Sequence, residues 1–162
     1  NTAHGKIELY QDFLTDFGEA LPVYKEPIES NRNKKAEKYP LTFMNTHSVF
    51  SVHGQHVDLP WILEARPEPR MEMSPVDAKA RNLEDGDLVE VFNDRGKFKV
   101  KIQISEGIKP GCLNLYQGWW PKHFPDGSHY GSLLHMEINP AQDAVIETNF
   151  APYDNLVEVK KA

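Results

Sequence analysis

The feature that most limits the fold of this chain is a pair of predicted strands joined by a short turn, in residues 88–104. The first, LVEVF, is apolar at Leu88, Val89 and Val91. After the turn NDRG, apolar residues occupy every second position: Phe98, Val100, Ile102 and Ile104. A period of two is typical of a strand with one buried face, so this segment predicts a β-hairpin in a mainly β protein.

One short helix is predicted ahead of this hairpin, over residues 74–83. Ser74 suits the N-cap, Pro75 the first helical position, and Asp77 places negative charge in the first turn. We expect its buried face to consist of Val76, Ala80 and Leu83. Further short strands are predicted at 41–44, within 107–120 and at 155–161, separated by Gly/Pro turns. Together they predict a small, mainly β, closed barrel.

The first 38 residues differ from the rest of the chain. They offer a short alternating strand at Ile7 and Leu9, a weak amphipathic turn, and the charged, patternless segment ESNRNKKAEK at 29–38. We therefore expect an N-terminal arm over 1–38 and one domain over 39–162. Because the chain begins with Asn1 rather than methionine, we expect a segment of a longer protein, whose compartment cannot be predicted.

Composition restricts the partners. The formal charge is -6 and no basic cluster is present, so nucleic acid is not expected. No apolar run approaches the roughly 18 residues that span a bilayer, so membrane insertion is not expected either. A single cysteine excludes a disulfide framework and any multi-cysteine metal site. His53 and His56 alone are a weak zinc pattern, and no residue stands in a catalytic pattern, so we assign no metal ligand and no catalytic residue.

An unusual run of polar residues follows the predicted strand at 41–44. Asn45, Thr46, His47 and Ser48 are four short hydrogen-bonding side chains in succession. A capped turn, the alternative interpretation, needs one or two of them. Neutral donors at a strand end suit the diphosphate, ribose and base edges of a ligand. Trp119 and Trp120 fit two interpretations equally: packing under a loop, or a platform for a flat heterocycle or for a partner surface.

Four segments together resemble one family: YPLTFMNTHSVFSVHGQH, MEMSPVDAKARNLEDGDLVEVFNDRGKFKVKIQISEGIKPGCL, GWW and NLVEVKK. Their order is similar to that in the C-terminal molybdopterin-dinucleotide-binding domain of the dimethyl sulfoxide reductase family of molybdenum and tungsten oxidoreductases. The similarity covers residues 39–161. It implies a closed, six-stranded double-psi β-barrel with one or two short helices, in agreement with the strand pattern.

The resemblance also implies which residues contact the cofactor, molybdopterin guanine dinucleotide. The polar loop after the first strand touches phosphates and ribose in this family, a later segment borders the cofactor, and a polar residue near the chain end lies at the pterin. His47 falls near a position where many members carry Arg. The matching residues here are Asn45, Thr46, His47, Ser48, His53, Gln117, Gly118, Trp119, Asn139, Asp143 and Asn155.

In this family the molybdenum or tungsten ligand, any iron–sulfur cysteines and the substrate funnel belong to other domains. The segment is therefore expected to hold and orient the cofactor, and to be inactive alone. Expected partners are the remaining domains of the parent oxidoreductase; a further candidate is an iron–sulfur electron-transfer subunit. The alternatives are a standalone small barrel subunit or partner-binding module, and a self-sufficient barrel enzyme. A self-processing enzyme needs a Gly-Ser site near its start, whereas Gly127-Ser128 and Gly131-Ser132 lie late in the chain.

Overall fold

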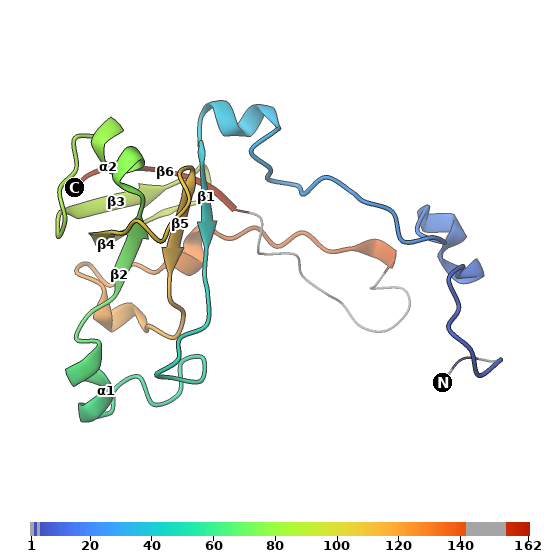
Figure 1. The fold of residues 1–162 in the computed structure, drawn as a ribbon, viewed down its shortest axis with the longest axis horizontal. Coiled ribbons are helices and arrows are strands. Elements are labelled where there is room, and N and C mark those ends of the chain that lie inside the picture. The colour runs from blue at the N-terminus through green and yellow to red at the C-terminus, as the bar shows by residue number, and fades with distance from the viewer. Residues whose placement is uncertain (1, 3, 142–154) are drawn as a thin grey trace. The chain divides into compact units, whose positions relative to one another are not determined.

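Six strands close into a barrel in the computed structural model, which describes residues 2, 4–141 and 155–162 (Figure 1). Their order around the barrel is β1-β5-β2-β4-β3-β6. The pairs β1/β5 and β2/β4 are parallel, and the other neighbours are antiparallel. The strands are β1 (Leu41–Met44), β2 (Arg70–Met73), β3 (Leu88–Phe92), β4 (Lys97–Ile104), β5 (Cys112–Leu115) and β6 (Asn155–Lys161). The mainly β, closed, six-stranded barrel is confirmed, and its two parallel pairs fit the double-psi arrangement implied by the resemblance.

The described helices are short. The two α-helices, α1 (Pro60–Ala65) and α2 (Pro75–Ala80), agree with the one or two that were expected. Four 3-10 helices accompany them: η1 (Asp12–Phe17), η2 (Lys34–Glu37), η3 (Pro121–His123) and η4 (Tyr130–Leu133).

Helix α2 begins as the sequence predicts but buries a different face. The Ser74 hydroxyl accepts a hydrogen bond from the Asp77 backbone N–H at 3.1 Å and donates one to the Asp77 carboxylate at 2.6 Å. Of the predicted buried face, Leu83 is buried, but Val76 and Ala80 are exposed and Ala78 is buried instead. A helix of six residues has fewer than two turns, so no apolar stripe develops and the residue facing the barrel is the buried one.

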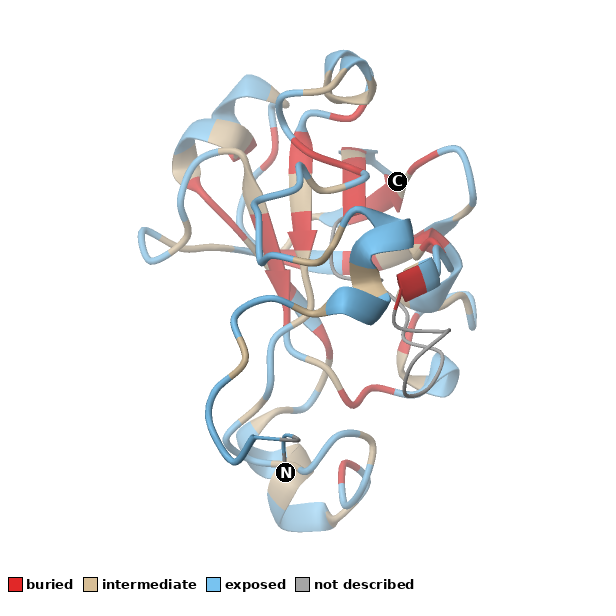
Figure 2. Ribbon diagram, turned by 90° about the vertical axis from the view of Figure 1, so that its right-hand side faces the viewer, coloured by how far each residue is buried: buried red, intermediate tan, exposed pale blue. Residues whose placement is uncertain are grey.

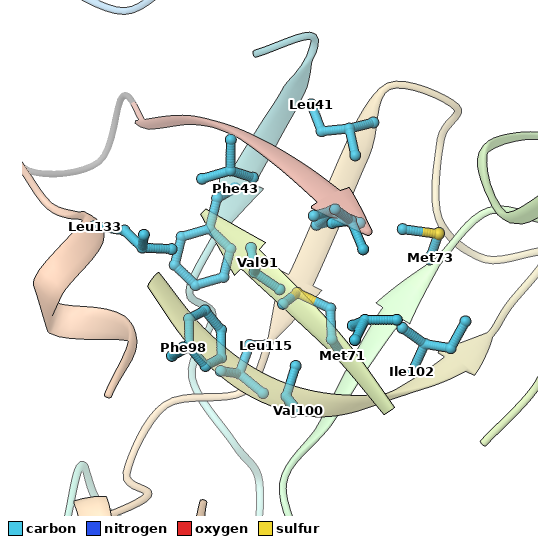
Figure 3. Close-up of a cluster of buried hydrophobic side chains, with 14 of the residues drawn as sticks. Leu41, Phe43, Met71, Met73, Val91, Phe98, Val100, Ile102, Leu115 and Leu133 are labelled. Carbon is cyan, nitrogen blue, oxygen red and sulfur yellow. The ribbon is translucent and has the colours of Figure 1, made fainter. Parts of the chain in front are cut away.

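The barrel core follows the alternation of the hairpin sequence. Phe98, Val100 and Ile102 of β4 are fully or almost fully buried, while the polar residues between them face outward (Figure 2). Inside the barrel the Phe98 ring lies 6.3 Å from the Phe43 ring between centroids (Figure 3). Burying a side chain of this size contributes roughly 1.5–3 kcal/mol, so these residues hold the strand ends in place.

Contacts divide the chain into two units. The described residues of 1–27 and 136–152 form one unit, and those of 28–135 and 153–162 form the barrel unit. The strand predicted at Ile7 and Leu9 is wrong: these residues are 89% and 72% exposed and have no strand partner in the described part of the chain. The boundary expected between residues 38 and 39 stays a prediction.

The polar segment 28–38 is held to the barrel by one buried carboxylate, that of Glu29. Its oxygens accept hydrogen bonds from the Leu156 backbone N–H at 2.8 Å, from Arg95 Nη2 at 3.0 Å, and from Lys35 Nζ. Burial by itself raises the pKa of Glu29, but the donors outweigh it and lower the pKa to about 2. The ion pairs and hydrogen bonds of Glu29 thus hold the segment 28–38, which has no apolar pattern, against the barrel.

Candidate cofactor-binding site

The barrel topology brings the predicted site residues to one end. β1 and β5 are parallel, so both finish at the same end of the barrel, which we call the exit end. The pairing directions place the starts of β2, β4 and β6 and the finish of β3 there too. The long connection 45–69, with α1, and the chain after residue 115 therefore leave from this end, whereas α2 follows the opposite end of β2 (Figure 1).

Hydrogen bonds join the chain after β1 to the end of β5 and to the chain that follows it. Asn45 Nδ2 donates to the Leu115 carbonyl at 2.7 Å, and Thr46 Oγ1 donates to Asn114 Oδ1 at 2.8 Å. The Gln117 backbone N–H donates to the Thr46 carbonyl at 2.8 Å. The four polar residues 45–48 are half-buried or exposed rather than enclosed in the barrel. Two segments about 70 residues apart in sequence thus form one polar surface.

Gly118 lets these two segments approach each other closely. Its φ is +104°, and a Cβ built there would lie 2.1 Å from the His53 carbonyl oxygen. Gln117 Nε2 lies 3.1 Å from His53 Nδ1, and the His47 and His53 rings meet edge to face at 5.0 Å. Only glycine fits at this position without moving the His53 backbone.

The two tryptophans have different environments. Trp119 is 3% exposed and packs in the core, whereas Trp120 is 51% exposed and donates through Nε1 to the Gly54 carbonyl at 3.1 Å. Beside them lies an open recess of about 340 Å³, lined by His53, Gly118, Trp119, Trp120, His129 and Tyr130. The packing interpretation thus holds for Trp119. An aromatic recess next to polar groups suits a flat heterocycle, and a platform at Trp120 stays a prediction.

His129 and Tyr130 form a neutral wall of this recess. Burial lowers the pKa of His129, against the opposing effect of the Trp119 carbonyl 2.9 Å from its Nε2. Since Nδ1 accepts from the Gly131 backbone N–H at 3.0 Å, the hydrogen of the neutral ring belongs on Nε2. Burial also raises the pKa of the Tyr130 hydroxyl. The side chains of His129 and Tyr130 are therefore both neutral near pH 7.

Arg66 belongs to the exit end, although nothing in the sequence singled it out. It follows α1 in the charged stretch EARPEPR, which resembles a solvated connection. Its Nη1 donates to Ser48 Oγ at 2.6 Å, and its guanidinium carbon lies 4.8 Å from the Trp119 ring centroid. Burial lowers the pKa of this guanidinium, so the site contains a partly dehydrated cation.

Unsatisfied buried groups also lie in this region. Within the described residues, Trp119 Nε1 and Ser51 Oγ are buried without a hydrogen-bond partner. Ser51 Oγ lies in ordinary contact range, 3.4 Å, of a Cβ at Gly118. Buried donors without partners are costly, and a polar ligand or water relieves that cost. The donor set fits an anionic nucleotide: neutral N–H and O–H groups with one cation.

The remaining predicted residues have other positions. Asn155 starts β6 at the exit end, is buried, and its Oδ1 accepts from the His135 backbone N–H at 3.4 Å. Asn139 belongs to the other unit, where its Oδ1 accepts from the Ala141 backbone N–H at 3.0 Å. Asp143 lies outside the described residues. Cofactor contact by each of the predicted residues stays a prediction.

Metal-ligand clusters and membrane-spanning helices are both absent from the described part of the chain. Residues 2, 4–141 and 155–162 contain no cluster of three or more His, Cys, Asp or Glu side chains arranged to hold a metal ion. None of the helices among them has the length and hydrophobicity needed to cross a bilayer.

A closed barrel with neutral donors, a dehydrated cation and an aromatic recess at one end defines a domain built to bind a large nucleotide cofactor. Comparison with known proteins identifies the family. The chain belongs to the molydopterin dinucleotide binding domain family, whose model matches residues 41–145. The family membership inferred from the sequence motifs is confirmed.

The chain is similar to part of several larger proteins. It is 38% identical over 99% of its length to a Halobacterium salinarum protein provisionally named as the catalytic subunit of a dimethyl sulfoxide reductase, and it covers 20% of that protein. It is 26% identical over 99% of its length to the dimethyl sulfoxide reductase DmsA of Haemophilus influenzae, covering 21% of it. The chain thus spans about a fifth of the length of these relatives.

A solved structure shares the fold. Acetylene hydratase from Pelobacter acetylenicus superimposes with a TM-score of 0.80 at 20% identity, over 99% of this chain and 24% of that chain. At this identity the likeness concerns the fold alone.

Proposed function

We propose that the exit end of the barrel holds the molybdopterin guanine dinucleotide of a molybdenum or tungsten oxidoreductase, through the polar residues 45–48, His53 and the segment 117–119. The observation that carries this assignment is the direct hydrogen bonding between the chain after β1, at residues 45–46, and the end of β5 with the chain that follows it, at residues 114–117. In a domain of this family, those converging donors provide a place for the ligand.

Different residues at the exit end suit different chemical groups of the dinucleotide. His47 is an exposed polar side chain suited to phosphate and sugar oxygens, whereas the Thr46 hydroxyl, whose hydrogen is donated to Asn114 Oδ1, can accept from a sugar hydroxyl. The recess beside Trp120 and Tyr130 suits a flat ring, from which it excludes water on one side. Asn139, Asp143 and Asn155 are proposed as further contacts from the family resemblance alone.

When bound, the cofactor supplies the metal centre at which redox chemistry occurs, and this chain binds and orients it. The metal ligand and the substrate path are proposed to lie in the parent protein outside this chain. Relatives named for dimethyl sulfoxide reduction and respiratory nitrate reduction support a reductase as the parent. An iron–sulfur electron-transfer subunit is proposed as a partner, and the isolated chain is expected to be inactive.

Cofactor retention tests the assignment. In the full-length parent protein, His47→Ala and Gln117→Ala remove an exposed and a half-buried donor at the exit end. Each should weaken retention by about tenfold, the effect of one hydrogen bond to a charged group. The measurement is pterin released per mole of purified protein, read by the fluorescence of its oxidised form.

Lys109→Ala is the matched control, because Lys109 is exposed and lies in the connection at the opposite end of the barrel. It should leave the pterin content unchanged. Equal pterin content in all three variants and the unsubstituted protein would contradict the placement of the site.

A further inference from the structure

Arg66 contacts both segments that leave the exit end, the connection 45–69 and the chain after β5. Its Nη1 donates to Ser48 Oγ in the chain after β1. Its guanidinium carbon lies 4.8 Å from the Trp119 ring centroid and 5.5 Å from that of Tyr116, both in the chain after β5. Its own backbone N–H closes α1 by donating to the Ile62 carbonyl. A long cationic side chain is thus fixed in one orientation.

The charge of Arg66 is not neutralised within the described residues. Arg70, Arg81 and Arg95 each form an ion pair with a carboxylate, whereas Arg66 forms none there. Removing a cation from water without a counter-charge is costly, as the downward pKa shift of Arg66 expresses. This cation without a counter-charge lies at the exit end, where the donors converge.

The acidic groups near Arg66 already have partners. An open pocket beside Arg66 is also lined by Glu68, Glu72 and Asp85. Asp85 Oδ1 accepts from the Ile104 backbone N–H at 2.7 Å. Glu68 pairs with Arg70 at 2.9 Å and with Lys101 at 2.8 Å, while Glu72 accepts from Asn114 Nδ2 at 2.7 Å. None of these three carboxylates forms an ion pair with Arg66 in the described part of the chain, so an external anion can serve as its counter-charge.

Ser48 adds a donor at the same place. Its oxygen accepts from Arg66 Nη1 at 2.6 Å and from the Phe50 backbone N–H at 3.0 Å. A hydroxyl has two acceptor positions and one hydrogen, so Ser48 can still donate to a ligand. Together, Ser48 and Arg66 offer one O–H and a planar row of N–H groups.

We infer that Arg66 is the anchor for the diphosphate group of the dinucleotide, with Ser48 as its partner. The inference rests on the proposed function and adds to it the one cation of the site. The guanidinium lies over the Trp119 ring, and the planar N–H groups of a guanidinium can bind two phosphate oxygens at once. A cation at this position gives affinity for the diphosphate where the net charge of the chain is -6.

GDP and GMP are the probes, because they differ by the second phosphate. The full-length parent protein in its apo form is titrated with each nucleotide by calorimetry, at two salt concentrations. Arg66→Gln should weaken GDP binding by about 10- to 100-fold, the loss of a charge-assisted bidentate contact, and reduce the preference for GDP over GMP. Arg66→Lys should recover part of the loss, since the charge returns without the planar fork.

Arg70→Gln is the matched control, since it removes a nearby arginine that is already paired with Glu68. It should leave GDP affinity within twofold. The melting temperature of each variant is measured in parallel, because a purely structural Arg66, or one that pairs with a carboxylate elsewhere in the parent, would lower that temperature without changing the affinity. That result overturns the inference.

Two further outcomes separate this inference from the proposed function. If Arg66→Gln binds GDP like the unsubstituted protein while His47→Ala loses pterin, the diphosphate anchor is wrong and the site stands. If the unsubstituted apo protein binds neither GDP nor the pterin dinucleotide, both are overturned.

Discussion

Replacing Gly118 by alanine tests how the exit end is assembled. The added Cβ would lie 2.1 Å from the His53 carbonyl oxygen, whereas ordinary contact begins at 3.4 Å, so the His53 backbone must retreat by about 1.3 Å (3.4 − 2.1). The positive φ of +104° adds about 1–2 kcal/mol for a residue with a Cβ. Overpacking adds roughly 1–3 kcal/mol. The expected loss in the free energy of unfolding is therefore about 2–5 kcal/mol.

Urea unfolding followed by tryptophan fluorescence measures this loss, because Trp119 and Trp120 directly follow the substituted position. Gly127→Ala is the control: its φ is +70° and its Cβ would meet nothing within 4 Å, so only the backbone strain remains. Gly118→Ala should lose at least 1 kcal/mol more than Gly127→Ala, by the overpacking contribution alone. Equal losses would refute the close approach of His53 to Gly118.

Two further predictions concern the anchors of the barrel. The pKa of Glu29 is lowered to about 2 from 4.5, so its stabilisation of about 3 kcal/mol is complete above pH 4.5 and disappears as the pH falls to 2. Glu29→Gln should therefore lose about that much at pH 7 and show a flatter acid limb in urea unfolding, and an unaltered limb would exclude the carboxylate as the cause. Ser74→Ala removes the N-cap of α2 and should cost about 1 kcal/mol by thermal unfolding, whereas a value near zero would mean that Asp77 holds this turn without it.

The parts of the fold that the sequence predicts well are those determined by local patterns. In the hairpin at 88–104, the alternation of apolar residues and the turn are both visible in the sequence. The N-cap Ser74 marks the start of α2 in the same way. Both elements are found where expected. The burial of Ala78 in place of Val76 could not be predicted in this way, because valine is the more apolar of the two and only the position of the barrel decides between them.

The sequence patterns also did not predict the contacts that charged side chains make with residues far away in the chain. Glu29 and Arg66 both lie in stretches that look solvated, and each is buried or half-buried by residues far away in the chain. The loop 45–48 was found because four polar residues after an apolar strand exceed what a turn needs. Its link to Gln117 through Thr46 depends on the parallel pairing of β1 and β5, which no local pattern encodes.

The position of β6 also determines when this site can form during biosynthesis. β6 (residues 155–161) closes the barrel, because it pairs with β1 on one side and with β3 on the other. Before this strand has left the ribosome, the nascent chain has an open sheet whose edge at β1 is unpaired on that side. A cofactor delivered at that time would meet a barrel that is not yet closed at β1, so we expect stable loading only after translation of β6.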